Sequence, residues 1–94
     1  MTEPFSVLLP VYGGDSPTAF LRSFDSVAKE QTLPPDQIVI VVDGPLGTQL
    51  RRAVEECAGA DGARVVYLPV NVGLARALEA GLAACSHEIV ARQD

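Results

Sequence analysis

Residues 37–44 read QIVIVVDG, and this stretch decides the fold class of the chain. Its first six residues hold a run of isoleucine and valine without polar alternation, which is typical of a strand covered on both faces. Asp43 and Gly44, followed by Pro45, then end the strand. Strands of this kind occur in parallel sheets flanked by helices, so we expect an α/β fold.

Apolar patterns elsewhere predict three further strands and three helices. Ser16 is a good helix cap and is followed by proline, while the pair Pro34-Pro35 prevents that helix from continuing. Gly81 lowers the helix propensity of the third helix, so we expect it to pack closely against a neighbour. The predicted strands start near residues 5, 37, 64 and 87, and the helical patterns cover Phe20–Ala28, Leu50–Cys57 and Leu74–Cys85.

The resulting order is β-α-β-α-β-α-β, with spacings that fit βαβ units. Right-handed crossovers then place the helices on the faces of a mostly parallel sheet. We therefore predict a three-layer α/β/α, Rossmann-like domain over residues 1–94, without an internal repeat, a linker or a second domain. A chain of 94 residues suffices for one small domain, and its hydrophobic content of 48% supports a packed core.

Composition excludes several classes of protein. The formal net charge is −5 and the basic residues form no stripe, which argues against nucleic-acid binding. We interpret Cys57 and Cys85 as small buried residues in a reducing compartment, rather than as a disulfide or metal site. The N-terminus shows no signal-peptide pattern, and no apolar run is long enough to cross a bilayer. We expect a cytoplasmic location, and membrane attachment of a longer parent protein stays open.

Three predicted strand ends should meet at one edge of the sheet, where ligands bind in open α/β proteins. Tyr12 ends the first strand and could stack on a nucleobase or sugar, or simply pack at the rim. Asp43 ends the second strand and could accept hydrogen bonds from a ribose hydroxyl or a base N–H. Alternatively, Asp43 caps the following helix or forms a turn with Gly44.

The third strand end leads to Asn71 and Gly73, which open the helix that carries Arg76. Asn71 can cap this helix, whose N-terminus and guanidinium together favour an anion. The alternative is a capped surface helix in which Arg76 pairs with Glu79. The chain lacks Gly-x-Gly-x-x-Gly and Gly-x-x-x-x-Gly-Lys-Ser/Thr, which disfavours a dinucleotide Rossmann site and a P-loop.

Taken in order, four segments resemble the nucleotide-binding half of family 2 glycosyltransferases, which have the GT-A fold. The resemblance extends over nearly the whole chain. It implies transfer of a sugar, with inversion, from a nucleotide-diphosphate sugar to a hydroxyl of a carbohydrate or lipid-linked acceptor. The matching segments are Ser6–Tyr12, Gln37–Gly44, Asn71–Gly81 and Ala91–Asp94.

The resemblance also implies a role for each matched position. Asp43 would hydrogen-bond the base or ribose, and Arg76 would approach the base or diphosphate. Asp94 would be the first acid of an Asp-x-Asp motif that helps to bind the nucleotide sugar and a divalent cation, Mg²⁺ or Mn²⁺. The cation would offset the charge of the departing diphosphate, which lets an acidic protein bind an acidic donor. The implied nucleotide-binding residues are Pro10, Val11, Tyr12, Asp43, Asn71, Gly73, Arg76 and Asp94.

The chain departs from the family pattern at several positions. A single acid, Asp43, stands where the family often has two, while Gly13 and Glu79 each replace a usual asparagine. The Asp-Gly-Pro-Leu sequence at residues 43–46 is similar to that of a subgroup of bacterial polysaccharide transferases.

The resemblance places the remaining parts of the enzyme beyond residue 94. These are the second acid of the motif, the acceptor site and the general base that an inverting transfer needs. Our hypothesis is that the chain is a fragment of a longer transferase, which binds nucleotide weakly, has no turnover and self-associates through an uncovered last strand.

Two other interpretations stay open. One is a non-catalytic α/β module for nucleotide binding or assembly, and the other, ranked last, is a flavodoxin-like or receiver-like domain. The codons after Asp94 in the source gene distinguish the first from a fragment: a second acid two residues on favours the transferase, and a stop codon favours the module.

Overall fold

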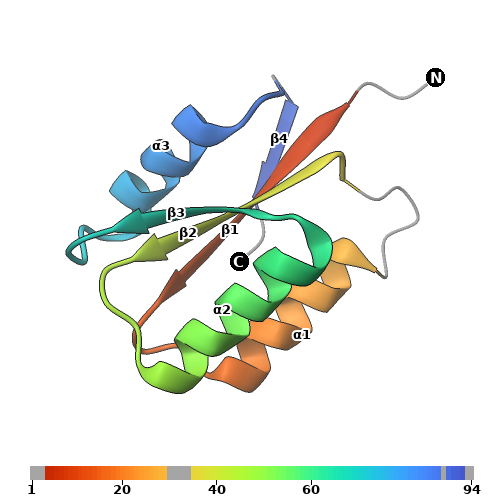
Figure 1. Ribbon diagram of the computed structural model, residues 1–94. Coiled ribbons are helices and arrows are strands. Elements are labelled where there is room, and N and C mark those ends of the chain that lie inside the picture. Colours follow the sequence, from red (N-terminus) through yellow and green to blue (C-terminus); the bar gives the residue numbers. More distant parts are fainter. Residues whose placement is uncertain (1–3, 30–34, 88, 93–94) are drawn as a thin grey trace.

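The computed structural model describes residues 4–29, 35–87 and 89–92 (Figure 1). Strands and helices alternate in the predicted order, which confirms the α/β assignment. The fourth strand begins at Ile89, slightly later than the sequence pattern indicated. The elements are β1 (Phe5–Tyr12), α1 (Pro17–Ala28), β2 (Gln37–Asp43), α2 (Thr48–Asp61), β3 (Arg64–Leu68), α3 (Leu74–Ala84) and β4 (Ile89–Arg92).

The strands form one sheet in the order β3-β2-β1-β4, and every neighbouring pair is parallel. The chain steps in one direction from β1 to β3 and then returns past β1 to β4. Since parallel crossovers are almost always right-handed, this reversal moves the connecting helix to the opposite face of the sheet. Figure 1 shows α1 and α2 on one face and α3 on the other, so the predicted three layers are confirmed.

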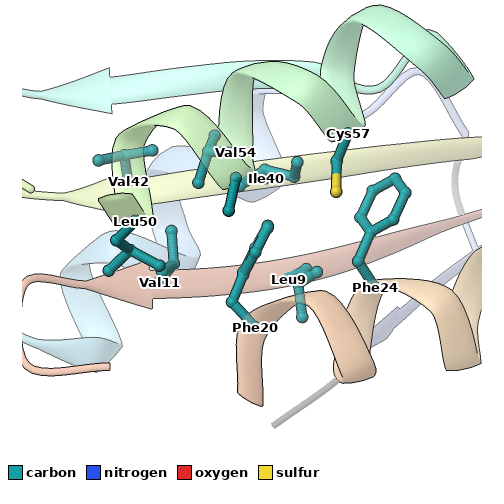
Figure 2. Packing of buried hydrophobic residues seen from close by; sticks show 10 residues of the cluster. Leu9, Val11, Phe20, Phe24, Ile40, Val42, Leu50, Val54 and Cys57 are labelled. Atoms are coloured by element: carbon teal, nitrogen blue, oxygen red, sulfur yellow. The ribbon is translucent and has the colours of Figure 1, made fainter. Parts of the chain in front are cut away.

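Strand β2 is buried on both faces, as its sequence predicted. Ile40 and Val42 point toward α1 and α2, whereas Val39 and Val41 point toward α3. This alternation follows from the two-residue period of a strand. The larger core cluster lies under α1 and α2 (Figure 2) and consists of Leu9, Val11, Phe20, Phe24, Ile40, Val42, Leu50, Ala53, Val54 and Cys57.

Helix α3 packs closely on its face of the sheet at Gly81. A Cβ atom at this position would lie 2.5 Å from both Leu8 Cδ2 and Val41 Cγ2. Since real Cβ atoms do not approach other atoms so closely, only glycine fits without a shift of α3, the strands or these two buried side chains. The predicted close packing of Gly81 is confirmed, and it brings the start of α3 to the strand ends.

The structure confirms the predicted helix start at Ser16. Ser16 caps α1, since its Oγ accepts a hydrogen bond from the Ala19 N–H, and Pro17 begins the helix.

Neither Cys57 nor Cys85 is part of a disulfide. Cys57 is buried in the core as expected, but Cys85 is only half-buried and lies just after α3. Burial raises the pKa of the Cys85 thiol, whose Sγ donates to the Gly81 carbonyl.

No helix in the described part of the chain is both long and apolar enough to cross a membrane.

Candidate functional site

A cavity of about 460 Å³ opens at the carboxyl ends of β1 and β2, on the side of the sheet covered by α3. We call it the α3-side cavity. Its volume falls within the range of about 300–1,000 Å³ that is usual for small-molecule sites. It lies beside the β1–β4 pair, where the chain reverses direction and where open α/β sheets bind ligands. The lining residues are Pro10, Val11, Tyr12, Asp15, Asp43, Asn71, Gly73, Leu74 and Ala77.

Most of the predicted site residues meet in this cavity. The exceptions are Arg76, which lies on the exposed surface of α3 and does not line the cavity, and Asp94, which lies outside the described residues. The other predicted residues, which come from three separate segments of the sequence, all line it: Pro10, Val11, Tyr12, Asp43, Asn71 and Gly73.

Asp43 is the most constrained polar residue of the cavity. It is only 5% exposed, and its carboxylate accepts two backbone hydrogen bonds from the start of α3. The Val72 N–H donates to Oδ1 with an N···O distance of 2.8 Å, and the Gly73 N–H donates to Oδ2 at 3.1 Å. The cap alternative is wrong, because α2 has Gly47 as its N-cap. Asp43 instead fixes the turn that precedes α3.

Asn71 does not cap α3, so that prediction is also wrong. The N-cap is Gly73, at a φ of 94°, and no side chain caps it. The Asn71 Nδ2 group donates instead to the backbone carbonyl of Asp43, with an N···O distance of 3.3 Å. Asn71 prefers this bond because the β2 end lies directly beside the β3–α3 turn. Gly44, at a φ of 89°, permits this approach because it has no side chain. A Cβ atom at this position would lie 2.8 Å from the backbone nitrogen of Asn71.

Tyr12 and Asp15, from the end of β1 and the turn that follows it, also line the cavity. Tyr12 is 51% exposed, and its backbone N–H donates to Asp15 Oδ2 at 3.1 Å. The Asp15 N–H donates in return to the Tyr12 carbonyl at 3.0 Å. Two hydrogen bonds between Tyr12 and Asp15 therefore stabilise this turn. At the next position a Cβ on Gly13 would lie 2.9 Å from the Pro45 carbonyl oxygen. This contact explains physically why Gly13 has no side chain here.

Three lining residues escaped the sequence prediction, namely Asp15, Leu74 and Ala77. Asp15 follows two glycines, and a position in such a loop-forming stretch gives no sign of a site. Leu74 and Ala77 fit the apolar pattern of α3, which gave no sign that this part of the helix faces a cavity. The spacing of Asp15 three residues after Tyr12 was the one available signal, because aspartate often bonds to nearby backbone in turns.

Two charged side chains of α3, Arg76 and Glu79, are exposed. Arg76 and Glu79, both described in the structure, form no ion pair, so the predicted alternative for Arg76 is wrong. Within the described ranges, no three His, Cys, Asp or Glu side chains come together to hold a metal ion. The predicted metal ligand, Asp94, lies outside those ranges.

A second cavity, of about 330 Å³, opens at the same edge on the side of α2. We call it the α2-side cavity. It contains Tyr67, which is 53% exposed, and Arg51, whose Nε donates to Glu55 at 3.2 Å. The sequence did not predict this cavity. Its lining residues are Val42, Gly44, Pro45, Leu46, Arg51, Tyr67, Leu68 and Pro69.

Comparison with known proteins gives consistent matches. The family model described as glycosyl transferase family 2 matches residues 6–94. An amylovoran biosynthesis glycosyltransferase from Erwinia amylovora is 39% identical over 90 residues. A UDP-Gal:alpha-D-GlcNAc-diphosphoundecaprenol beta-1,3-galactosyltransferase from Escherichia coli is 33% identical over 93 residues. These alignments cover 96% and 99% of this chain, but each covers 34% of the relative. The chain thus spans about a third of the length of these relatives.

A solved structure shows the same fold. It is glucosyl-3-phosphoglycerate synthase from Mycobacterium tuberculosis, in complex with Mn²⁺, UDP and glucosyl-3-phosphoglycerate. The TM-score is 0.63 at 29% sequence identity, and the match covers 97% of this chain and 33% of that protein. The predicted GT-A arrangement is therefore confirmed.

Proposed function

The chain belongs to glycosyl transferase family 2, and on this premise we propose that it forms the donor-nucleotide pocket of a sugar transferase. The transferase moves a sugar from a nucleotide-diphosphate sugar to an acceptor hydroxyl, with inversion at the anomeric carbon. The nucleotide occupies the α3-side cavity. The observation that carries this proposal is the buried Asp43 carboxylate, held at the strand ends inside the cavity.

The hydrogen bonds of Asp43 indicate which part of the ligand it contacts. Each carboxylate oxygen can accept two hydrogen bonds and already accepts one from a backbone N–H. Each oxygen can therefore accept one more hydrogen bond, from a ligand. The carboxylate also already supplies the negative charge that the α3 N-terminus favours. A diphosphate at the same point would be repelled. We therefore assign Asp43 to a base N–H or a ribose hydroxyl, as the sequence resemblance implied.

The remaining cavity residues suit the same ligand. Tyr12 presents an aromatic ring at the rim, on which a base or sugar can stack. Pro10, Val11 and Gly73 complete the walls of the base pocket. Arg76 lies on the first turn of α3, outside the cavity, which supports a role at the diphosphate rather than at the base.

A divalent cation is part of the proposal. The similar synthase structure contains both Mn²⁺ and UDP, which supports Mg²⁺ or Mn²⁺ with a nucleotide donor in this chain. Asp94 would be a ligand of the cation, together with an acid beyond residue 94. When bound, the cation would offset the negative charge of the diphosphate.

The relatives also support the remaining proposals. The names of two relatives refer to amylovoran biosynthesis and to a diphosphoundecaprenol acceptor. We accordingly propose a carbohydrate or lipid-linked acceptor and a role in bacterial polysaccharide synthesis. A cytoplasmic location stays a prediction from the sequence. The chain spans about a third of the relatives, so the acceptor site and the general base are assigned to sequence outside these residues.

Calorimetric titration of the 94-residue chain tests the proposal. UDP with Mn²⁺ should bind, and inorganic phosphate with Mn²⁺ should not, because the cavity contacts are made to the nucleoside. An assay with a UDP-sugar and a lipid-linked acceptor should show no transfer, since the proposal assigns the general base to sequence outside these residues. Failure of UDP to bind in the millimolar range would contradict the nucleotide assignment. Sugar transfer by the purified chain would contradict the assigned position of the base.

A further inference from the structure

The turn after β1 carries a contact that the proposed function does not use. A Cβ atom on Gly14 would lie 2.6 Å from Cε2 of Tyr12 and 2.9 Å from both Cζ and Oη. The Tyr12 ring therefore occupies the space that a side chain at position 14 would need. Real Cβ atoms make no contacts this short, so any other residue at position 14 would displace the ring.

The backbone of this turn is fixed independently of the ring. Tyr12 and Asp15 exchange two hydrogen bonds, one through the Asp15 carboxylate and one between backbone groups. Gly13 packs against the Pro45 carbonyl of the neighbouring loop. The Tyr12 side chain is half exposed, and the Gly14 contact limits its position from one side. Tyr12 also lines the α3-side cavity, so a ligand in this cavity can contact it.

We propose that Gly14 is a positioning residue for the nucleotide, because the absence of a side chain there leaves room for the hydroxyl end of the Tyr12 ring. This inference rests on the proposed function and adds a determinant of donor affinity outside the residues that touch the nucleotide. With the ring in this position Tyr12 lines the α3-side cavity, where a base or sugar can stack on it. A side chain at position 14 turns the ring away and removes the stacking surface.

Gly14→Ala is a clean test because it should leave the fold intact. Gly14 is exposed and is not among the glycines with a positive φ, so alanine causes no backbone strain there. The atoms that a Cβ would meet belong to the end of one rotatable side chain. The unfolding temperature of Gly14→Ala should therefore be close to that of the wild type. Gly59→Ala, at a helical site with nothing within 4 Å of the added Cβ, is the control for an added methyl group.

A double-mutant cycle measures whether Gly14 acts through Tyr12. The proteins are the wild type, Gly14→Ala, Tyr12→Ala and the double variant, each titrated with UDP and Mn²⁺. Loss of an aromatic stacking partner weakens base binding roughly 5- to 150-fold. We expect Gly14→Ala to weaken UDP binding about fivefold or more in the wild type, and less than about twofold in the Tyr12→Ala background. Wild-type affinity in Gly14→Ala, or equal losses in both backgrounds, would overturn the inference.

Tyrosine fluorescence tests the ring position without a ligand. The chain has two tyrosines and no tryptophan, so Tyr67→Phe leaves Tyr12 as the single emitter. In this background Gly14→Ala should increase quenching by acrylamide, whereas Gly59→Ala should not. Unchanged quenching would show that Gly14 does not hold the ring. If the wild type does not bind UDP at all, the proposed function fails, and the quenching result alone decides whether Gly14 positions Tyr12.

Discussion

The two cavities at the carboxyl edge of the sheet differ in chemistry more than in size. The α3-side cavity contains the carboxylates of Asp15 and Asp43, while the α2-side cavity contains the guanidinium of Arg51. Each also has a half-exposed tyrosine. Net charge alone would place an acidic ligand beside Arg51. However, Arg51 is exposed and already paired with Glu55, whereas Asp43 is buried and fixed by two backbone hydrogen bonds. On the proposed function, this difference teaches that fixed polar geometry is a better indicator of the nucleotide site than local charge.

Removal of the Asp43 carboxylate should have the largest effect on both stability and UDP affinity. In Asp43→Ala the N–H groups of Val72 and Gly73 lose a charged acceptor, which should lower the free energy of unfolding by about 2–3 kcal/mol. UDP affinity should fall about tenfold or more, through loss of the ligand contact and of the turn before α3. Urea unfolding and calorimetric titration measure the two effects.

Arg51→Ala is the matched control in the α2-side cavity. It removes an exposed ion pair, so the free energy of unfolding should change by no more than about 0.5 kcal/mol, and UDP binding should stay the same. If Arg51→Ala abolished UDP binding while Asp43→Ala left it intact, the nucleotide site would be the α2-side cavity and not the α3-side cavity.

Disruption of the close packing of α3 should have the next largest effect on stability and UDP affinity. The added methyl group in Gly81→Ala would meet Leu8 and Val41, and such overpacking costs about 1–3 kcal/mol. Since the shift moves α3, it should weaken UDP binding without changing the α2-side cavity. Thermal unfolding measures the first effect and titration the second. Gly59→Ala, which adds the same methyl group to an open helical site, should be neutral or stabilising by up to about 1 kcal/mol. Equal stability of the two variants would contradict the packing at Gly81.

Arg76 should contribute the smallest effect. An exposed cation gives only about 0.2–1 kcal/mol to an ionic contact, so Arg76→Ala should weaken binding of UDP roughly 1.5- to 5-fold. The loss should shrink at high salt, because exposed charges are screened. Titration of both proteins at low and high ionic strength checks this. A salt-independent loss would instead indicate that Arg76 contacts the base.

The fold could be predicted because its signals are local. The unbroken Ile and Val run of β2 indicated a strand buried on both faces, and Ser16 with Pro17 marked the start of α1. Even the close packing at Gly81 followed from the cost of a glycine inside a helix. The position of Asp43 at a strand end could also be predicted, since only the end of β2 had to be found.

The contacts inside the site could not be predicted in the same way. Asp43 bonds to backbone groups about thirty residues away, which become neighbours only through the sheet order and the positive φ of Gly73. Asn71 was assigned to the helix cap because asparagine suits that position locally, yet the nearby carbonyl of Asp43 provides a better-placed acceptor. The contact between Gly14 and Tyr12 depends on a side-chain torsion that no sequence pattern specifies.

The most direct test is a nuclear magnetic resonance titration of the 94-residue chain with UDP and Mg²⁺. If the α3-side cavity binds the nucleotide, the largest changes in amide chemical shift will occur at Tyr12, Gly14, Val72 and Gly73. The amides of Leu46, Arg51 and Leu68, around the α2-side cavity, will change little. Larger changes at these last three amides than at the first four, or no changes in the millimolar range of UDP, would contradict the account.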